Sequence, residues 1–207
     1  MTLEERLSMR LTGPLGQPTA TDLVARLVEV GTAPAVLELL EELEEASPKA
    51  MRAAIEALPE LNRRVGLEVI ASWLDLGVAL AVSSGATALR YFKESPLILG
   101  LFESASVRDL ALSVALELAD NDVNVALEFV KTAPELFAVL PPDRLPLWVE
   151  AGLDLARLDH VLGLEFFRQG PAIAAVVPLD QVRSWIGFGM KLITLNSLGK
   201  TDYLGTL

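Results

Sequence analysis

Three short segments of the 207-residue chain have residue types and spacings that could support chemistry. Residues 194–201 end in Gly-Lys-Thr, as a phosphate-binding loop does. Such a loop also needs a glycine where Thr194 stands and a preceding β-strand, so that backbone N–H groups can surround the phosphates. The segment before Thr194 has helical periodicity instead. We therefore interpret Gly199 and Lys200 as part of a loop between helices.

A second segment, residues 120–131, begins like a calcium-binding loop. Asp120, Asp122 and Asn124 occupy the first three ligand positions of such a loop. The sixth position should be a glycine and the twelfth a glutamate, but Val125 and Lys131 stand there. We therefore predict a helix cap and turn at this place, and no metal site.

The third segment contains His160, the single histidine, directly after Asp159. A partnered Asp and His can transfer protons, but adjacent residues on a helix do not face each other. No nucleophile is placed near them in the sequence. We predict a histidine in a loop or at the C-terminal end of the long helix of its unit.

Two further carboxylates, Asp75 and Asp154, leave an alternative open. If they were buried, the chain could be a helical enzyme or a small-molecule-binding domain. Asp75 follows Trp73 by two positions and Asp154 follows Trp148 by six, so each lies shortly after a tryptophan of the repeat. That association with the repeat favours a structural role, because catalytic residues need not repeat.

The composition excludes several classes of protein. The chain has 28 acidic and 17 basic residues and a net charge of −11, which argues against nucleic-acid binding. A hydrophobic fraction of 52% is too high for a disordered acidic chain. The absence of cysteine excludes disulfides and thiolate metal sites and favours a reducing compartment. We expect no cofactor.

The mean hydropathy of +0.42 raises the question of membrane insertion. A spanning helix needs about 20 consecutive apolar residues, and the apolar runs here are shorter. The first residues are acidic where a signal peptide is basic. We predict a cytoplasmic protein without a membrane-inserted segment.

Helical periodicity dominates the chain, and no segment alternates as a strand would. In residues 35–46, leucine and valine recur at helical spacing and glutamates occupy the opposite side. These glutamates form a candidate partner-binding face: Glu38, Glu41, Glu42 and Glu45. The other interpretation is an acidic face that is only solvated.

Prolines recur at a fixed spacing, since Pro59, Pro96, Pro134 and Pro171 are separated by 37, 38 and 37 residues. Tryptophan follows three of them by 14 residues, and glycine follows each tryptophan by four: Trp73, Trp148 and Trp185, with Gly77, Gly152 and Gly189. A tryptophan presents a large surface for a neighbouring helix to cover, and a glycine one turn later allows close approach. A proline cannot continue the helix before it.

We therefore expect each unit to contain a long helix with tryptophan and glycine, a shorter aromatic helix, and a brief segment that the proline opens. The predicted fold is all-α: a right-handed, HEAT-like α-solenoid of repeats of about 37 residues. Residues 1–58 would form an N-terminal helical capping subdomain, followed by repeats in 59–207. The predicted units are 59–95, 96–133, 134–170 and 171–207.

The last unit stops short of its own proline, which would fall near position 208. No polar capping helix follows, although solenoids normally end in one. We therefore expect an uncapped C-terminal end and a chain that is the N-terminal part of a longer protein.

The pattern Trp-x3-Gly-x2-Leu, followed by an aromatic pair and Ser-Pro or Gly-Pro, occurs in residues 72–99 and 147–173. It resembles the helical N-terminal region of CbbO- and NorD-type proteins. Those proteins have a C-terminal von Willebrand factor A domain and work with MoxR-class AAA+ ATPases to activate or remodel enzymes such as rubisco or nitric oxide reductase. The Asp-x-Ser-x-Ser metal motif of that domain is absent here, and no functional residue is carried over.

The resemblance implies a protein partner, either a MoxR-class ATPase or its target. Together with the repeats, it predicts a non-catalytic scaffold or adaptor that mediates protein–protein interaction. The oligomeric state and the face that binds stay open.

Overall fold

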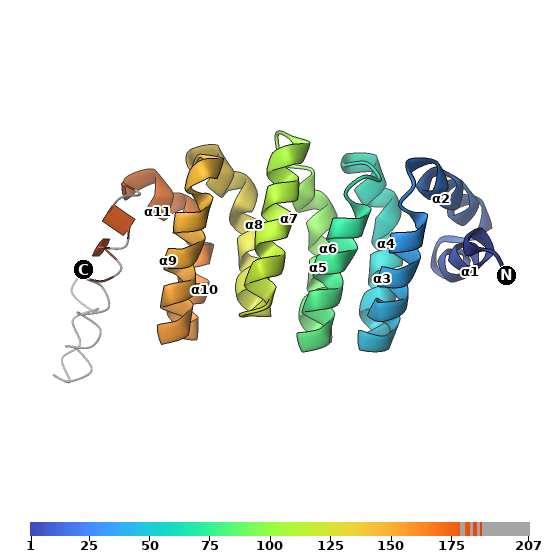
Figure 1. Cartoon of the computed structure of the whole chain (residues 1–207), viewed down its shortest axis with the longest axis horizontal. Helices are drawn as coiled ribbons and strands as arrows, with labels where there is room; N and C mark the ends of the chain where they lie inside the picture. Colours follow the sequence, from blue (N-terminus) through green and yellow to red (C-terminus); the bar gives the residue numbers. More distant parts are fainter. Residues whose placement is uncertain (179–180, 183, 186, 188–207) are drawn as a thin grey trace. The chain divides into compact units, whose positions relative to one another are not determined.

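The computed structural model describes residues 1–178, 181–182, 184–185 and 187. Within these residues the chain is helical and contains no β-strand, which confirms the predicted all-α fold. The helices with described bounds (Figure 1) are α1 (Leu3–Leu15), α2 (Gln17–Val30), α3 (Ala33–Ala46), α4 (Pro48–Arg64), α5 (Ile70–Ser83), α6 (Gly85–Leu99), α7 (Ala105–Ala119), α8 (Val123–Val139), the 3-10 helix η1 (Pro142–Arg144), α9 (Leu145–Leu158), α10 (His160–Arg168) and α11 (Gly170–Val176).

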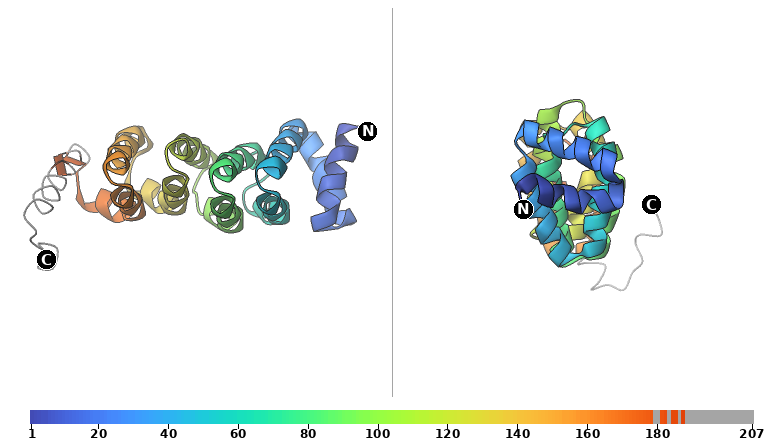
Figure 2. Two further views of the ribbon diagram at one scale, coloured as in Figure 1. Left: turned by 90° about the horizontal axis from the view of Figure 1, so that it is seen from below. Right: turned by 90° about the vertical axis from the view of Figure 1, so that its right-hand side faces the viewer.

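The chain divides into two compact units, Met1–Pro134 and a second unit that begins at Glu135. In the first unit α3, α5 and α7 pack side by side, and α4 packs on α6 behind them. Helices α1 and α2 pack on each other, and α1 also contacts α3 and α4. Figure 2 shows α1 lying crosswise to the axes of α3 and α4. In the second unit α10 packs on α9 and is followed by α11.

Helix pairs form because one residue both ends a helix and caps the next. Ser47, Ser84 and Asp159 all have extended backbone conformations, with φ of −160°, −156° and −153°. Each side-chain oxygen accepts a hydrogen bond from an N–H group of the following first turn. Such caps contribute roughly 1 kcal/mol and leave no length for a loop. Neighbouring helices therefore fold back directly on each other.

The predicted role of the prolines is wrong at three of four positions. Pro59 lies inside α4, Pro96 inside α6 and Pro134 inside α8, whereas Pro171 lies in the first turn of α11. A proline inside a helix costs about 3 kcal/mol. In α4 this cost is offset by apolar residues buried on both sides of the proline, because a fully buried leucine contributes roughly 1.5–3 kcal/mol.

This correction changes the unit. The aromatic helix and the predicted brief segment are one helix in α6, so α5 and α6 form a pair of helices over Ile70–Leu99 instead of a three-part unit. The predicted boundaries at 58/59 and 95/96 fall within α4 and α6. The capping subdomain, the handedness of the stack and its solenoid character stay predictions. The predicted C-terminal end lies outside the described residues.

None of the helices in the described part of the chain combines the length and apolar character needed to cross a lipid bilayer.

Candidate functional site

Two of the chemically suggestive segments are helix caps, and for the first of them a cap was predicted. The Asp122 carboxylate accepts hydrogen bonds from the N–H groups of Asn124 (2.8 Å) and Val125 (3.2 Å) at the start of α8. The Asp159 carboxylate accepts from Val161 and Leu162. His160 is the first residue of α10, so its predicted place in a loop or at a helix C-terminus is wrong. Among the described residues, no three histidine, aspartate or glutamate side chains are grouped so as to hold a metal ion. The Gly-Lys-Thr segment lies outside the described residues.

The buried carboxylates of the enzyme alternative are surface groups. Asp75 and Asp154 are both exposed, and Arg157 donates a hydrogen bond of 3.0 Å to Asp154. The reason is geometric, because successive helix residues are about 100° apart, so Asp75, two residues after Trp73, and Asp154, six residues after Trp148, point away from the tryptophan of the same helix. Burial of Trp73 and Trp148 therefore directs these aspartates outward.

The acidic face of α3 is divided into two parts by α1. Glu41 forms ion pairs with Arg6 and Arg10, and Glu44 forms another with Arg10. The hydrogen bond that Arg10 donates to the Glu44 carboxylate raises the pKa of Arg10 above its ordinary value. Glu41 therefore pairs with arginines of the same chain, so its assignment to a free partner-binding face was wrong.

The remaining three glutamates of that face stay exposed. Glu38, Glu42 and Glu45 follow each other at spacings of four and three residues, so they share one side of α3. No ion pair joins them to another residue in the part of the chain that the structure describes. Like charges at these spacings cost roughly 0.2–0.5 kcal/mol per pair. We call these three residues the α3 carboxylate face.

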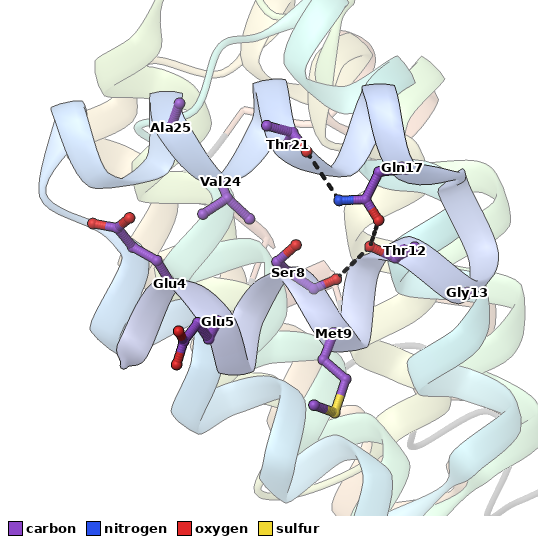
Figure 3. Close-up of a pocket in the computed structure, with 10 residues that line it drawn as sticks. All are labelled: Glu4, Glu5, Ser8, Met9, Thr12, Gly13, Gln17, Thr21, Val24 and Ala25. Carbon is purple, nitrogen blue, oxygen red and sulfur yellow. Dashed lines mark hydrogen bonds between the residues drawn. The ribbon is translucent and has the colours of Figure 1, made fainter. Parts of the chain in front are cut away.

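A groove of about 620 Å³ lies between α1 and α2. Figure 3 shows Glu4 and Glu5 at one end and a chain of hydrogen bonds at the other, in which Gln17 contacts both Thr12 and Thr21. Met9 is 67% exposed beside the groove. Carboxylates and an exposed thioether suit a basic, partly apolar partner segment better than an anionic ligand.

The first tryptophan-bearing helix pair, α5–α6, has a closed polar and aromatic core. Trp73 is fully buried and packs edge to face on Phe92 with ring centroids 4.8 Å apart. Its indole N–H donates to the Ser95 hydroxyl at 2.7 Å, and the Tyr91 hydroxyl donates to the Trp73 carbonyl at 3.2 Å. A Cβ on Gly77 would lie 2.0 Å from Phe92, so glycine permits this close approach.

The second pair, α9–α10, repeats the rings but not the hydrogen bonds. Trp148 is fully buried and stacks on Phe166 at 4.5 Å. A Cβ on Gly152 would lie 2.4 Å from Phe167, so this glycine has the same function as Gly77. The indole N–H of Trp148 is buried and has no hydrogen-bond acceptor. Gly170 occupies the place of Ser95, 22 residues after the tryptophan.

The third tryptophan differs from the other two. Trp185 is 49% exposed, so the expected burial in a seam is not seen. Trp73 and Trp148 are covered by aromatic side chains that begin 18 residues later. The equivalent position for Trp185 is residue 203, which lies outside the described residues, as does Gly189.

Two features of these sites were missed in the sequence. Arg6 and Arg10 stand one turn apart in an otherwise acidic N-terminal segment, a spacing that could have indicated a basic stripe. Ser-Pro and Gly-Pro were treated as equivalent, although only serine carries a hydroxyl. In both cases the residue type alone could have indicated an interaction. The partners were distant in the sequence: Arg6 and Arg10 pair with glutamates of α3, and Ser95 binds Trp73.

No protein-family model, no curated protein and no solved structure shows a significant match to the chain. The similarity to CbbO and NorD proteins stays a prediction from the motifs.

Proposed function

We propose that the chain is a non-catalytic helical-repeat scaffold or adaptor that binds a basic surface of a partner protein. The observation that carries the proposal is the α3 carboxylate face, Glu38, Glu42 and Glu45. These glutamates repel one another and lack a described counter-charge, whereas neighbouring Glu41 is neutralised by α1. A basic partner surface would supply the missing counter-charges.

The helix pairs support the proposal because they hold such a face on a rigid element. Val36, Leu40 and Leu43 are fully buried, so α3 is fixed from its other side. Charge on a fixed helix steers association and selects partners with a complementary pattern. The resemblance to CbbO and NorD proteins would make the partner a MoxR-class ATPase or its target, in the cytoplasm.

The test compares two variants with the same change in net charge. One reverses the α3 carboxylate face, as Glu38→Lys/Glu42→Lys/Glu45→Lys. The control reverses three exposed acids of the α6–α7 loop and α7, as Glu103→Lys/Asp109→Lys/Glu117→Lys. Glu41 is left unchanged because its loss would also detach the arginines of α1.

Affinity capture from a native lysate, quantified by mass spectrometry, is the measurement. We expect proteins that the unaltered chain captures to be retained by the control and reduced at least tenfold by the α3 variant. Raising the salt concentration should weaken the same captures, because exposed charge pairs are screened. Equal capture by both variants would show that the α3 carboxylate face does not bind the captured partners.

A further inference from the structure

The helix pairs α3–α4 and α5–α6 place acidic and basic side chains on opposite sides of the first unit. Helices α3 and α5 pack side by side and α4 packs on α6 behind them, so the outer surfaces of the two layers point in opposite directions (Figure 2). Helices α3 and α5 contain six acidic residues and neither lysine nor arginine. Helices α4 and α6 contain six lysine or arginine residues and three glutamates. One side of these pairs is therefore acidic and the other is basic.

The cap serines determine which residues of the two layers stand at the same level. Antiparallel helices rise equally per residue, so residues equidistant from the cap between them lie at about the same level. The hydrogen bond between Trp73 and Ser95 shows this for α5–α6, since each stands eleven residues from Ser84. Ser47 has the same extended conformation as Ser84, so the same relation applies to α3–α4.

Acidic side chains of one layer stand level with basic side chains of the other. Three such pairs, which we call the level pairs, consist of exposed residues: Glu45 with Lys49, Glu42 with Arg52, and Asp75 with Lys93. The members of the first two stand two and five residues from Ser47, and those of the third stand nine residues from Ser84. Glu38 is the exception, because Glu56 stands at its level.

The two members of the third level pair point away from each other. Asp75 stands two residues from Trp73, whose ring packs on α6, so Asp75 lies on the far side of α5. Lys93 stands two residues from Tyr91 and from Ser95, which both form hydrogen bonds with Trp73, so it lies on the far side of α6. The matched charges therefore face two different neighbours.

The basic members of the level pairs are available to another molecule. Within the described part of the chain, Lys49 and Lys93 form no ion pair. Arg52 pairs with Glu56 at 2.8 Å, and both side chains are at least half exposed. Surface pairs of this kind contribute about 0–1 kcal/mol, so Arg52 can exchange its partner for another carboxylate.

We propose that copies of this chain stack, with α3 and α5 of one copy on α4 and α6 of the next. A shift across two helix layers, about 20 Å, brings the acidic member of each level pair opposite the basic member in the next copy. Each copy uses two different surfaces, so the association continues head to tail without closing. The inference rests on the proposed function, because it names the basic surface that Glu42 and Glu45 bind.

The size of the contact makes this association weak and reversible. Each face is about 20 Å long and two helices, or about 20 Å, wide, so it covers about 400 Å² on each copy. Stable complexes bury about 800 Å² on each partner. At about 0.15 M salt the Debye length is about 8 Å, so repulsion between the net charges of −11 is screened more than the contacts within the level pairs.

The test measures self-association of the full chain by sedimentation velocity, at concentrations up to about 1 mM because the contact is small. One variant reverses the acidic members, as Glu42→Lys/Glu45→Lys/Asp75→Lys. The other reverses the basic members, as Lys49→Glu/Arg52→Glu/Lys93→Glu. We expect the unaltered chain to self-associate and each variant alone to do so at least tenfold more weakly.

An equimolar mixture of the two variants should recover the association of the unaltered chain, because the facing surfaces again have opposite charges. Both variants keep a negative net charge, so attraction between whole molecules would not explain the recovery. All substituted residues are exposed, and circular dichroism checks that each variant is folded. An unaltered chain that stays monomeric, or a mixture that does not recover association, would overturn the proposal.

Capture from a lysate separates this inference from the proposed function. The variant with reversed basic members keeps the α3 carboxylate face, so it should capture other proteins as the unaltered chain does. If the unaltered chain stays monomeric while reversal of the α3 carboxylate face still reduces capture, the stacking is wrong and the proposed function stands.

Discussion

The helix pairs α5–α6 and α9–α10 have the same aromatic plan but different polar interiors. Each buries a tryptophan, a glycine one turn later and an aromatic pair from the following helix. In the first pair the indole N–H is bound by Ser95, and in the second it has no acceptor. The difference comes from one position, Ser95 against Gly170, at the same distance from its tryptophan.

That position also coincides with a difference in helix continuity. Helix α6 runs without interruption through Ser95 and Pro96, whereas α10 ends at Arg168 and α11 begins at Gly170. Glycine is about 1 kcal/mol less favourable than alanine in a helix, and a following proline further disfavours helical backbone. In α6 the residue before the proline is a serine, which avoids the glycine cost and whose hydroxyl oxygen accepts the hydrogen bond of the Trp73 indole N–H. Pro59 and Pro134 also lie inside helices and follow Leu58 and Ala133, so glycine before the proline is what distinguishes the interrupted helix.

The largest expected difference between the pairs comes from removing the indole N–H. Trp73→Phe deletes ring atoms and leaves the Ser95 hydroxyl buried without its donor, so we expect the opening free energy of α6 to fall by about 2–4 kcal/mol. Trp148→Phe deletes the same atoms but also removes an unsatisfied donor. For α10 we therefore expect a loss of about 1–2 kcal/mol.

Amide hydrogen exchange read by mass spectrometry resolves the two helices in one experiment, because peptides from α6 and α10 report separately. Each variant is the control for the other, since the change in side chain is identical. Equal losses in α6 and α10 would show that the Ser95 hydrogen bond does not distinguish the two pairs.

The features that the sequence predicted well are those set by local periodicity. Trp73, Gly77 and Phe92 do pack together, and Trp148, Gly152 and Phe167 do so in the second unit. Apolar spacing determines which side of a helix is buried, so it predicts both the helices and these seams. The cap at Asp122 was equally local, because a cap binds N–H groups within three residues.

The features that were mispredicted depend on contacts distant in the sequence. Pro59 does not end its helix because α4 is held by packing on α6, which local rules cannot show. Glu41 was assigned to a free face because its partner Arg6 lies 35 residues earlier. Only the fold brings α1 across α3 and divides the acidic residues into a neutralised part and an exposed part.

A reciprocal exchange of the key residue should transfer the polar interior from one pair to the other. Ser95→Gly leaves the Trp73 N–H unsatisfied and adds a helix glycine, so we expect α6 to lose about 2 kcal/mol of opening free energy. Gly170→Ser should satisfy the Trp148 N–H and raise the opening free energy of α10 by about 1 kcal/mol.

The same exchange measurement detects both changes, and Gly170→Ala is the control for Gly170→Ser. Alanine supplies the helix propensity and the Cβ without the hydroxyl. A gain in the serine variant that the alanine variant matches would assign the effect to propensity and not to the hydrogen bond.

The smallest expected effect concerns Tyr91, whose hydroxyl has no counterpart on Phe166 of the second pair. At neutral pH, Tyr91→Phe should cost roughly 0.5–1.5 kcal/mol, because it removes the hydrogen bond to the Trp73 carbonyl. Burial raises the pKa of Tyr91 well above the ordinary value of 10.0. The unfolded chain therefore releases this proton at a lower pH than the folded chain does.

The sign of the pH dependence follows from that difference. The stabilisation from Tyr91 is complete below pH 10 and is lost as the pH rises from there toward the raised pKa, by up to about 1.4 kcal/mol per pH unit. Guanidinium unfolding at pH 8.5 and pH 11 should show a larger loss for the unaltered chain than for Tyr91→Phe, because the Tyr91 hydroxyl is the only ionisable group by which the two chains differ. An equal loss in the two chains would mean that the buried hydroxyl does not link proton release to unfolding of the first helix pair.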